Sequence, residues 1–264
     1  MMIDPHLHID SCRRDDLASM ATAGITAVIT LSYYPHLNLT LSARTILDSF
    51  ERALNFETWR GEQELIDVHV GISLNPVSIP TDYEKVLEAI PKYLAEHKIV
   101  AIGEIGLEPG SKTCSDLTRQ EEIVRAQLRI AKGHGMMVVF HTPHSDKEKW
   151  VEQYLDMIAQ EKVEPAKVVI DHADASITKK VFDAGCNLGI TVQPWRGLGP
   201  QDAAEILKDC ALDKVLIDSD CNIALLSDKL SVPKTALEMK RIGFSEDGIK
   251  RVVFENPVRI FKLA

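Results

Sequence analysis

The chain has 264 residues, enough for one large domain or two small ones, and 45 % of them are hydrophobic, which excludes a disordered protein. Thirty Lys and Arg residues stand against 39 Asp and Glu residues, so the formal net charge is −9 at pH 7. This acidic balance argues against a broad basic surface for nucleic acid or anionic membranes. It does not exclude an enzyme that binds an anionic substrate through bound metal ions.

The five cysteines include no CxxC pair. An odd number of cysteines in a chain long enough to bury a core predicts reduced thiols rather than a disulfide framework. The first residues lack the apolar stretch of a signal peptide, and no run of about 18 apolar residues occurs. We therefore expect a cytoplasmic protein without membrane contact.

Short runs rich in Val and Ile alternate with amphipathic segments along the chain. Several runs are apolar at every position, which is typical of parallel strands buried on both faces. The opening MIDPHLH is the first predicted strand. The other predicted strands are 25–31, 65–72, 99–103, 136–140, 167–171, 187–192 and 214–218.

The segments between these strands carry apolar residues three and four positions apart, with charged residues on the other face, as amphipathic helices do. The clearest predicted helices are 82–97, 117–135, 146–162, 177–185 and 200–210.

Eight predicted strands alternate with helices, and a helical tail follows from about Val232. This pattern predicts an α/β fold, a (β/α)8 TIM barrel that forms one domain over residues 1–264. An open doubly wound sheet is the alternative, but no GxGxxG or P-loop motif follows the first strand to favour it. The least regular stretch, 36–62, contains a long amphipathic segment that we expect to fold over the mouth of the barrel.

Polar residues collect where the predicted strands end, which is where barrel enzymes keep their active sites. A single His or Glu at such a place is commonly structural, but five strand ends together indicate a binuclear site for divalent metal ions. His6 and His8 are two positions apart on one strand, so their side chains share a face. The strand ends carry His6, His8, Glu104, His141, His172 and the segment Asp218-Ser219-Asp220.

Five motifs resemble, in order, the metal motifs of the TatD-like metal-dependent hydrolases, a family of the amidohydrolase superfamily. The motifs are PHLHID, AIGEIGLE, VVFHTP, IDHAD and VLIDSDCN, and the tail NPVRIF resembles the family's closing motif. The resemblance spans essentially the whole chain, and AIGEIGL is its most specific element. It implies a barrel hydrolase with two divalent metal ions, which the ligand types suit as Zn, Mn, Ni or Mg.

Carried over position by position, the resemblance divides the implied ligands between two metal ions. The first ion would be held by His6, His8 and Asp220, the second by His141 and His172, and both by a bridging Glu104.

The resemblance also implies the catalytic residues. Two metal ions can activate a water molecule and polarise the scissile bond. Asp220 would accept or relay the proton of that water, and Glu104 would bridge the ions. Asp218 takes the supporting position in the family's ETD motif.

Three positions depart from the pattern of the family's nucleases. The stretch after the third strand is GISLNP, without the His of GxHP, and Pro143 stands where an Arg follows the fifth-strand His. After the sixth-strand His, residues 173–176 read ADAS instead of CFSG. The absent groups are those expected to contact phosphate. The substrate therefore stays open between a phosphodiester, as in a DNase, and a small ester, lactone or amide; the alternative function is a non-catalytic metal-binding scaffold.

Four residues in loops at the predicted mouth are candidates for substrate contact. His36 and His144 follow the second and fifth strands, and Trp195 and Arg196 lie in a loop after the seventh. We expect them to meet a small-molecule or nucleic-acid-fragment substrate.

Three further carboxylates lie near the predicted ligands. Asp171 precedes His172 and should face the opposite way along a strand, so we interpret it as a contact between barrel and helix. Asp10 and Asp174 are hypothesised to orient the ligand histidines.

Overall fold

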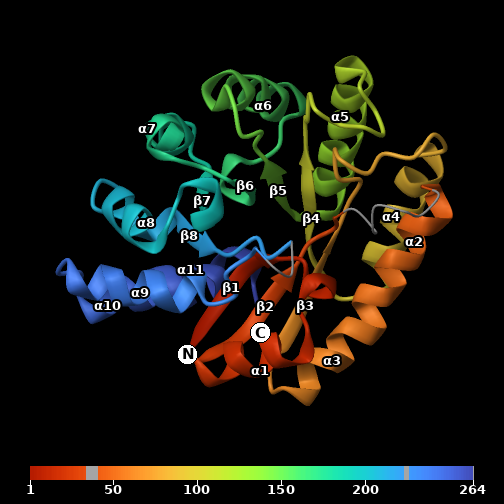
Figure 1. The fold of residues 1–264 in the computed structure, drawn as a ribbon. Helices are drawn as coiled ribbons and strands as arrows, with labels where there is room; N and C mark the ends of the chain where they lie inside the picture. Colours follow the sequence, from red (N-terminus) through yellow and green to blue (C-terminus); the bar gives the residue numbers. More distant parts are fainter. Residues whose placement is uncertain (34–40, 223–225, 264) are drawn as a thin grey trace.

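The computed structural model of the protein describes residues 1–33, 41–222 and 226–263. Eight parallel strands follow one another around one sheet in chain order, and helices surround them (Figure 1). The strands are Met2–Leu7 (β1), Ile25–Thr30 (β2), Asp67–Ile72 (β3), Ile99–Gly106 (β4), Met137–His141 (β5), Val168–Ile170 (β6), Asn187–Thr191 (β7) and Val215–Asp218 (β8).

The first and last strands meet just beyond the end of β8. The backbone N–H of Asp220 donates to the carbonyl oxygen of His6 at 3.0 Å, and that of His8 donates to the carbonyl oxygen of Cys221 at 3.0 Å. The sheet is therefore a nearly closed barrel, and the predicted (β/α)8 TIM barrel is confirmed. The alternative of an open doubly wound sheet is wrong, because the strand order runs from β1 to β8 without reversal.

Helices on the outside connect the strands and cover the barrel wall. Among the described residues, none of the helices combines the length and the apolar character that crossing a membrane requires. The connecting α-helices are Arg14–Thr22 (α1), Ala43–Glu51 (α2), Thr58–Gln63 (α3), Glu84–Glu96 (α4), Leu117–His134 (α5), Lys147–Glu161 (α6), Ala175–Asp183 (α7) and Pro200–Leu207 (α8).

The longest helix, α5, shows how the sequence sets the bounds of an element. Asp116 precedes the helix, and its side chain accepts a hydrogen bond from the backbone N–H of Thr118 at 3.0 Å. Gly135 ends the helix in the left-handed conformation, with φ at 67°, which glycine adopts without steric cost. The chain then enters β5, which carries His141 at its end.

The stretch between β2 and β3 packs beside the barrel rather than over its mouth. α2, the π-helical η2 (Arg52–Glu57) and α3 continue into one another and contact α4 and β3. Ile46 and Phe50 are buried in the same apolar cluster as Ile72, so the apolar face of the segment covers the barrel wall. The expectation that this segment covers the mouth is therefore wrong for its described part, and residues 36–40 lie outside the described residues.

The predicted helical tail is present, and its last helix closes the bottom of the barrel. Asn256 donates from its side-chain amide to the carbonyl oxygens of Leu212 and Val215, at 2.6 and 2.8 Å, where β8 begins. Phe261 is buried in an apolar cluster with Val100 of β4. The opposite end of the barrel, where the strands finish, is left for the functional site. The tail comprises Ser231–Arg241 (α9), Glu246–Lys250 (α10), the π-helical Arg251–Glu255 (η6) and Asn256–Phe261 (α11).

Candidate metal centre

The structure brings all six predicted metal ligands together at the carboxyl ends of the strands. β1, β4 and β5 each place one of them directly, and the others stand one or two residues beyond β1, β6 and β8. Two of these positions have positive φ, 55° at His172 and 36° at Asp220. Such strain in residues other than glycine is concentrated at functional sites. The six residues are His6, His8, Glu104, His141, His172 and Asp220.

One half of the centre consists of three buried atoms that face one another without a hydrogen-bond partner among the described residues. They are Nε2 of His6, Nε2 of His8 and Oδ1 of Asp220. Oδ1 of Asp220 lies 3.1 Å from Nε2 of His8 and 3.9 Å from Nε2 of His6. Two donors about 2.1 Å from one metal ion are about 3 to 3.5 Å apart. Burying polar atoms without partners costs free energy, so the donor set fits a cation held between them.

Glu104 lies between this half of the centre and a second one. Its Oε2 is 3.4 Å from Nε2 of His6 and 3.5 Å from Nε2 of His8. Its Oε1 is 2.9 Å from Nε2 of His172 and 3.3 Å from Nδ1 of His141. Each carboxylate oxygen therefore faces a different pair of histidines, as a carboxylate shared by two ions would.

Every histidine of the centre has its other ring nitrogen against an acceptor outside it. Such a partner fixes the tautomer and the ring orientation, so that the inner nitrogen is free to bind a metal ion. The four pairs are Nδ1 of His6 with Asp171 at 2.5 Å, Nδ1 of His8 with the carbonyl oxygen of Leu31 at 2.9 Å, Nε2 of His141 with Glu108 at 3.3 Å, and Nδ1 of His172 with the hydroxyl of Thr191 at 2.7 Å.

Asp171 belongs to this outer set, so its interpretation as a contact between barrel and helix is wrong. β6 ends at Ile170, and the left-handed φ of His172 breaks the alternation of the strand, which turns both side chains inward. Gly189 of β7 makes this possible, because a Cβ atom there would lie 2.2 Å from Oδ1 of Asp171.

Buried carboxylates beneath His6 differ in their affinity for protons. Burial raises the pKa of Asp4 to about 6. Burial, with the charge of Asp171, raises the pKa of Asp218 well above its usual value. Burial would raise the pKa of Asp171 as well, but the hydrogen bond to His6, the charges of His6 and His172 and the backbone N–H of His172 together outweigh burial and lower that pKa to about 2. Asp171 is therefore the charged member that faces the ring of His6.

Two histidines of the centre, His8 and His141, have raised pKa values despite their burial. Burial lowers the pKa of His8, but the carboxylates of Asp220 and Glu104 outweigh burial and raise it to about 9. The pKa of His141 is raised to about 9 in the same way, by Glu104 and Glu108 against the effect of burial. A metal ion that binds here must displace these protons.

Several side chains that support the candidate ligands were not identified from the sequence. Asn75 donates to Oε2 of Glu104 at 3.1 Å, and the ring of Tyr33 stacks on that of His8 at a centroid distance of 4.3 Å. Glu108, which contacts His141, was also missed. All three follow strand ends, so their position was a signal. The amide of Asn75 and the phenol of Tyr33 are not types that indicate metal binding, and nothing in the sequence pattern singled out the carboxylate of Glu108.

Two more amides hold the other oxygen of Asp220. Gln193 donates to Oδ2 at 2.9 Å, and Asn222 donates to the same atom at 3.0 Å. Oδ1 of Asp220 is thereby left to face the centre.

A cavity of about 530 Å³ opens beside the second half of the centre. His144 and Arg196 line it together with His141 at the end of β5 and His172 just beyond β6. Trp195 does not line this cavity; it is 39 % exposed, and the guanidinium of Arg196 lies 4.6 Å from its ring centroid. His36 lies outside the described residues. The cavity is thus bordered by two of the four residues that we expected to contact substrate.

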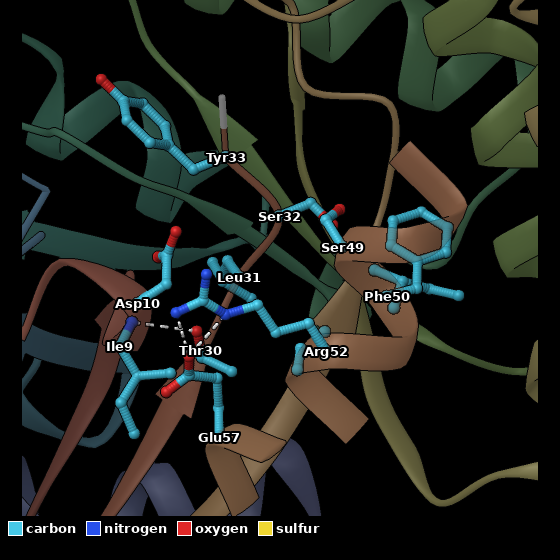
Figure 2. A pocket seen from close by; sticks show the side chains of 13 residues that line it. Ile9, Asp10, Thr30, Leu31, Ser32, Tyr33, Ser49, Phe50, Arg52 and Glu57 are labelled. Atoms are coloured by element: carbon cyan, nitrogen blue, oxygen red, sulfur yellow. Dashed lines mark hydrogen bonds and ion pairs between the residues drawn. The ribbon is translucent and has the colours of Figure 1, made fainter. Parts of the chain in front are cut away.

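A smaller cavity of about 50 Å³ lies between the loops after β1 and β2 and the helix η2, with Tyr33 on its wall. Figure 2 shows the guanidinium of Arg52 reaching toward Asp10 across this cavity, above the buried Glu57, with which it pairs at 2.7 Å. Asp174 caps α7. The hypothesis that Asp10 and Asp174 orient the ligand histidines is therefore wrong, because other acceptors hold those rings.

Comparison with known proteins places this geometry in a family. The family model described as TatD related DNase matches residues 3–262. A metal-dependent hydrolase of Methanocaldococcus jannaschii is 33 % identical over 263 residues, which cover 99 % of this chain and 100 % of that protein.

Two solved structures extend the comparison to the fold. The TatD-like protein of Archaeoglobus fulgidus superposes with a TM-score of 0.81 at 25 % identity, over 99 % of this chain and 100 % of that one. A TatD homologue of Escherichia coli superposes with a TM-score of 0.75 at 18 % identity, over 100 % of this chain and 98 % of that one. The chain therefore belongs to the TatD related DNase family and is a metal-dependent hydrolase.

Proposed function

We propose that the chain hydrolyses a small substrate at a binuclear divalent-metal centre. The observation that supports this most is the set of partnerless buried atoms facing one another, beside histidines whose outer nitrogens are all held by acceptors. The first ion would be held by His6, His8 and Asp220, the second by His141 and His172, and both by Glu104.

The types of donor atom determine which metal ions the proposed centre would bind. Imidazole and carboxylate donors suit Zn, Mn or Ni, and the carboxylate oxygens also admit Mg. When bound, two such ions lower the pKa of a water molecule and polarise the scissile bond.

Asp220 is the residue placed to accept the proton of the attacking water. Its Oδ2 is fixed by the amides of Gln193 and Asn222, so the side chain cannot rotate freely. Its Oδ1 faces the centre and has no hydrogen-bond partner among the described residues. A positioned carboxylate of this kind acts as a general base.

The cavity indicates the size of the substrate. A volume of about 530 Å³ suits a small molecule or a short nucleic-acid fragment. The family description favours a phosphodiester, whereas the net charge of −9 and Pro143 favour a small ester, lactone or amide. The names of the related proteins describe hydrolases, and nothing in the described part of the chain favours a non-catalytic scaffold.

Replacing Asp220 by Asn tests the proposed role of this residue. Asn keeps the shape and one oxygen donor but cannot accept the proton, so we expect kcat/KM to fall by about 100- to 10,000-fold, or about 3 to 5 kcal/mol. The other five ligands should keep metal bound. The measurement is hydrolysis of thymidine dinucleotides, p-nitrophenyl esters and lactones by Zn- or Mn-loaded protein, with metal content assayed on the same samples.

Asp202→Asn is the matched control, because Asp202 lines the cavity and binds the backbone N–H of Gly199 without contacting the centre. It should retain activity. Near-normal turnover by a fully loaded Asp220→Asn variant would show that another group takes the proton. A wild-type protein that binds no metal and hydrolyses none of these substrates would contradict the proposed function.

A further inference from the structure

Two cations line the cavity of about 530 Å³ without an ion-pair partner among the described residues. Lys147, the first residue of α6, donates from Nζ to the backbone carbonyl oxygen of His172. Arg196 stacks on the ring of Trp195. Within the described ranges, no carboxylate oxygen lies within 4.0 Å of either cationic group. Both positive charges are therefore left for something that enters the cavity.

The carboxylates of the same wall are already engaged. Glu108 accepts from the backbone N–H of Gly110 at 2.8 Å and contacts His141. Asp174 and Asp202 each accept a backbone N–H at the start of a helix, at 2.9 and 2.8 Å. These carboxylates already accept hydrogen bonds from other groups. Lys147 and Arg196 are therefore the charged groups of the wall that remain available to a ligand.

The two cations act on each other electrostatically. Burial lowers the pKa of Lys147; the charges of Asp174 and Asp171 oppose burial, and the charge of Arg196 makes a smaller contribution in the same direction as burial. The charge of Arg196 also contributes to the low pKa of Glu108, behind the hydrogen bond from His141. Lys147 and Arg196 line the same cavity, so an anion bound between them would be attracted by both positive charges.

We propose that Lys147 and Arg196 bind an oxyanion group of the substrate, a carboxylate or a phosphate, away from the bond that is cleaved. This inference rests on the proposed function, because the cleaved bond would lie over the metal centre, beside which the same cavity opens. It assigns the substrate to small anionic molecules. Lys147 would bind one oxygen as a compact cation, and the planar guanidinium of Arg196 would bind two.

Binding to the metal-free protein tests the anion site independently of catalysis. The full-length chain is stripped with EDTA and titrated calorimetrically with inorganic phosphate and with glutarate. We expect at least one of them to bind, with an affinity that falls about 10-fold or more in Lys147→Met and in Arg196→Gln. The tighter of the two ligands identifies the oxyanion. Lys147→Arg, which keeps the charge, should retain most of the affinity.

Lys149→Met is the matched control for Lys147→Met. Lys149 lies two positions along the same helix and does not line this cavity; its Nζ is 4.4 Å from the ring centroid of Trp150. The control should bind anions as the wild type does. If neither anion binds, or if Lys147→Met and Arg196→Gln bind as tightly as Lys149→Met, the inference is wrong.

Paired substrates separate this inference from the proposed function. The pairs are p-nitrophenyl butyrate with mono-p-nitrophenyl glutarate, and a thymidine dinucleotide without and with a terminal phosphate. In at least one pair the metal-loaded wild type should favour the anionic member by about 10-fold in kcat/KM, mainly through KM, and Lys147→Met should abolish that preference. Turnover without any such preference would refute the anion site alone. Anion binding that depends on Lys147 in a protein without turnover would refute the hydrolase proposal alone.

Discussion

The ring of His6 is held at its outer nitrogen by Asp171, and this contact depends on one glycine. Asp171 contacts its outer nitrogen at 2.5 Å, and Asp171 fits only because Gly189 has no side chain. An orienting carboxylate of this kind acts through the histidine, so Asp171 is a positioning residue.

Gly189→Ala should therefore weaken metal binding without touching a ligand. The added Cβ atom would lie 2.2 Å from Oδ1 of Asp171, so the carboxylate must move away from His6. We expect the affinity for Zn at the first half of the centre to fall by about 10- to 100-fold, as for other losses of an orienting partner. Competition with a chromophoric chelator measures it, and Asp171→Asn should show a loss of the same order.

Gly133→Ala provides the control for this change. Gly133 lies within α5, and a Cβ atom there would meet nothing within 4 Å. Ala favours the helix by about 1 kcal/mol relative to Gly, so stability should rise slightly and Zn affinity should stay unchanged. Wild-type Zn affinity in Gly189→Ala would refute the positioning role of Asp171.

Single residues also show why the candidate ligands could be picked out from the sequence and the side chains that support them could not. His141 and Glu104 are types that can bind metal, and both lie near strand ends, so residue type and position predicted that they would come together. The side chain of Asp171 points inward because His172 has a left-handed φ. No sequence pattern predicts that backbone conformation at a histidine. Asn75 reaches Glu104 through a loop whose path the sequence leaves open.

At the scale of elements, strand β3 carries a half-buried histidine outside the candidate centre. Burial lowers the pKa of His69, and the nearby Lys98 lowers it further, while Asp67 opposes them. The folded protein therefore resists protonation of His69 more than the unfolded chain does. Stability from this residue is present above the unfolded pKa of 6.5 and is lost as the pH falls below it.

We accordingly predict that His69→Gln makes the protein less sensitive to acid. Between about pH 7.5 and pH 5.5, the wild type should lose more of its free energy of unfolding than the variant does. Urea unfolding of the metal-free proteins measures both, so that the other histidines contribute equally to each. Lys98→Met should show part of the same effect. An identical pH dependence in wild type and His69→Gln would contradict the prediction.

The hydrophobic periodicity predicted the existence of the helices and strands well. It was less successful in predicting where each element ends and which surface it covers. β4 runs to Gly106 rather than to residue 103 because Gly106 still pairs with His141 of β5, although the polar Glu104 interrupts the apolar run. The amphipathic segment of α2 required a buried face, but amphipathicity does not say which surface provides it. The barrel wall, not the mouth, provides that surface.

At the scale of the whole molecule, eight alternations of strand and helix were enough to predict the barrel, since few other folds bury so many apolar strands in parallel. The cavity could not be predicted from the sequence. Lys147 and Arg196 belong to loops and helix starts that come together only when the barrel closes. The same closure brings β1 and β8 together and joins His8 to Asp220.

Anomalous diffraction from crystals grown with Zn or Mn tests the binuclear centre most directly. We predict two anomalous peaks per chain, both beside Glu104, one among His6, His8 and Asp220 and the other between His141 and His172. Soaking the crystals in EDTA should remove both peaks. A single peak, or peaks confined to the protein surface, would contradict a centre of two metal ions bridged by Glu104.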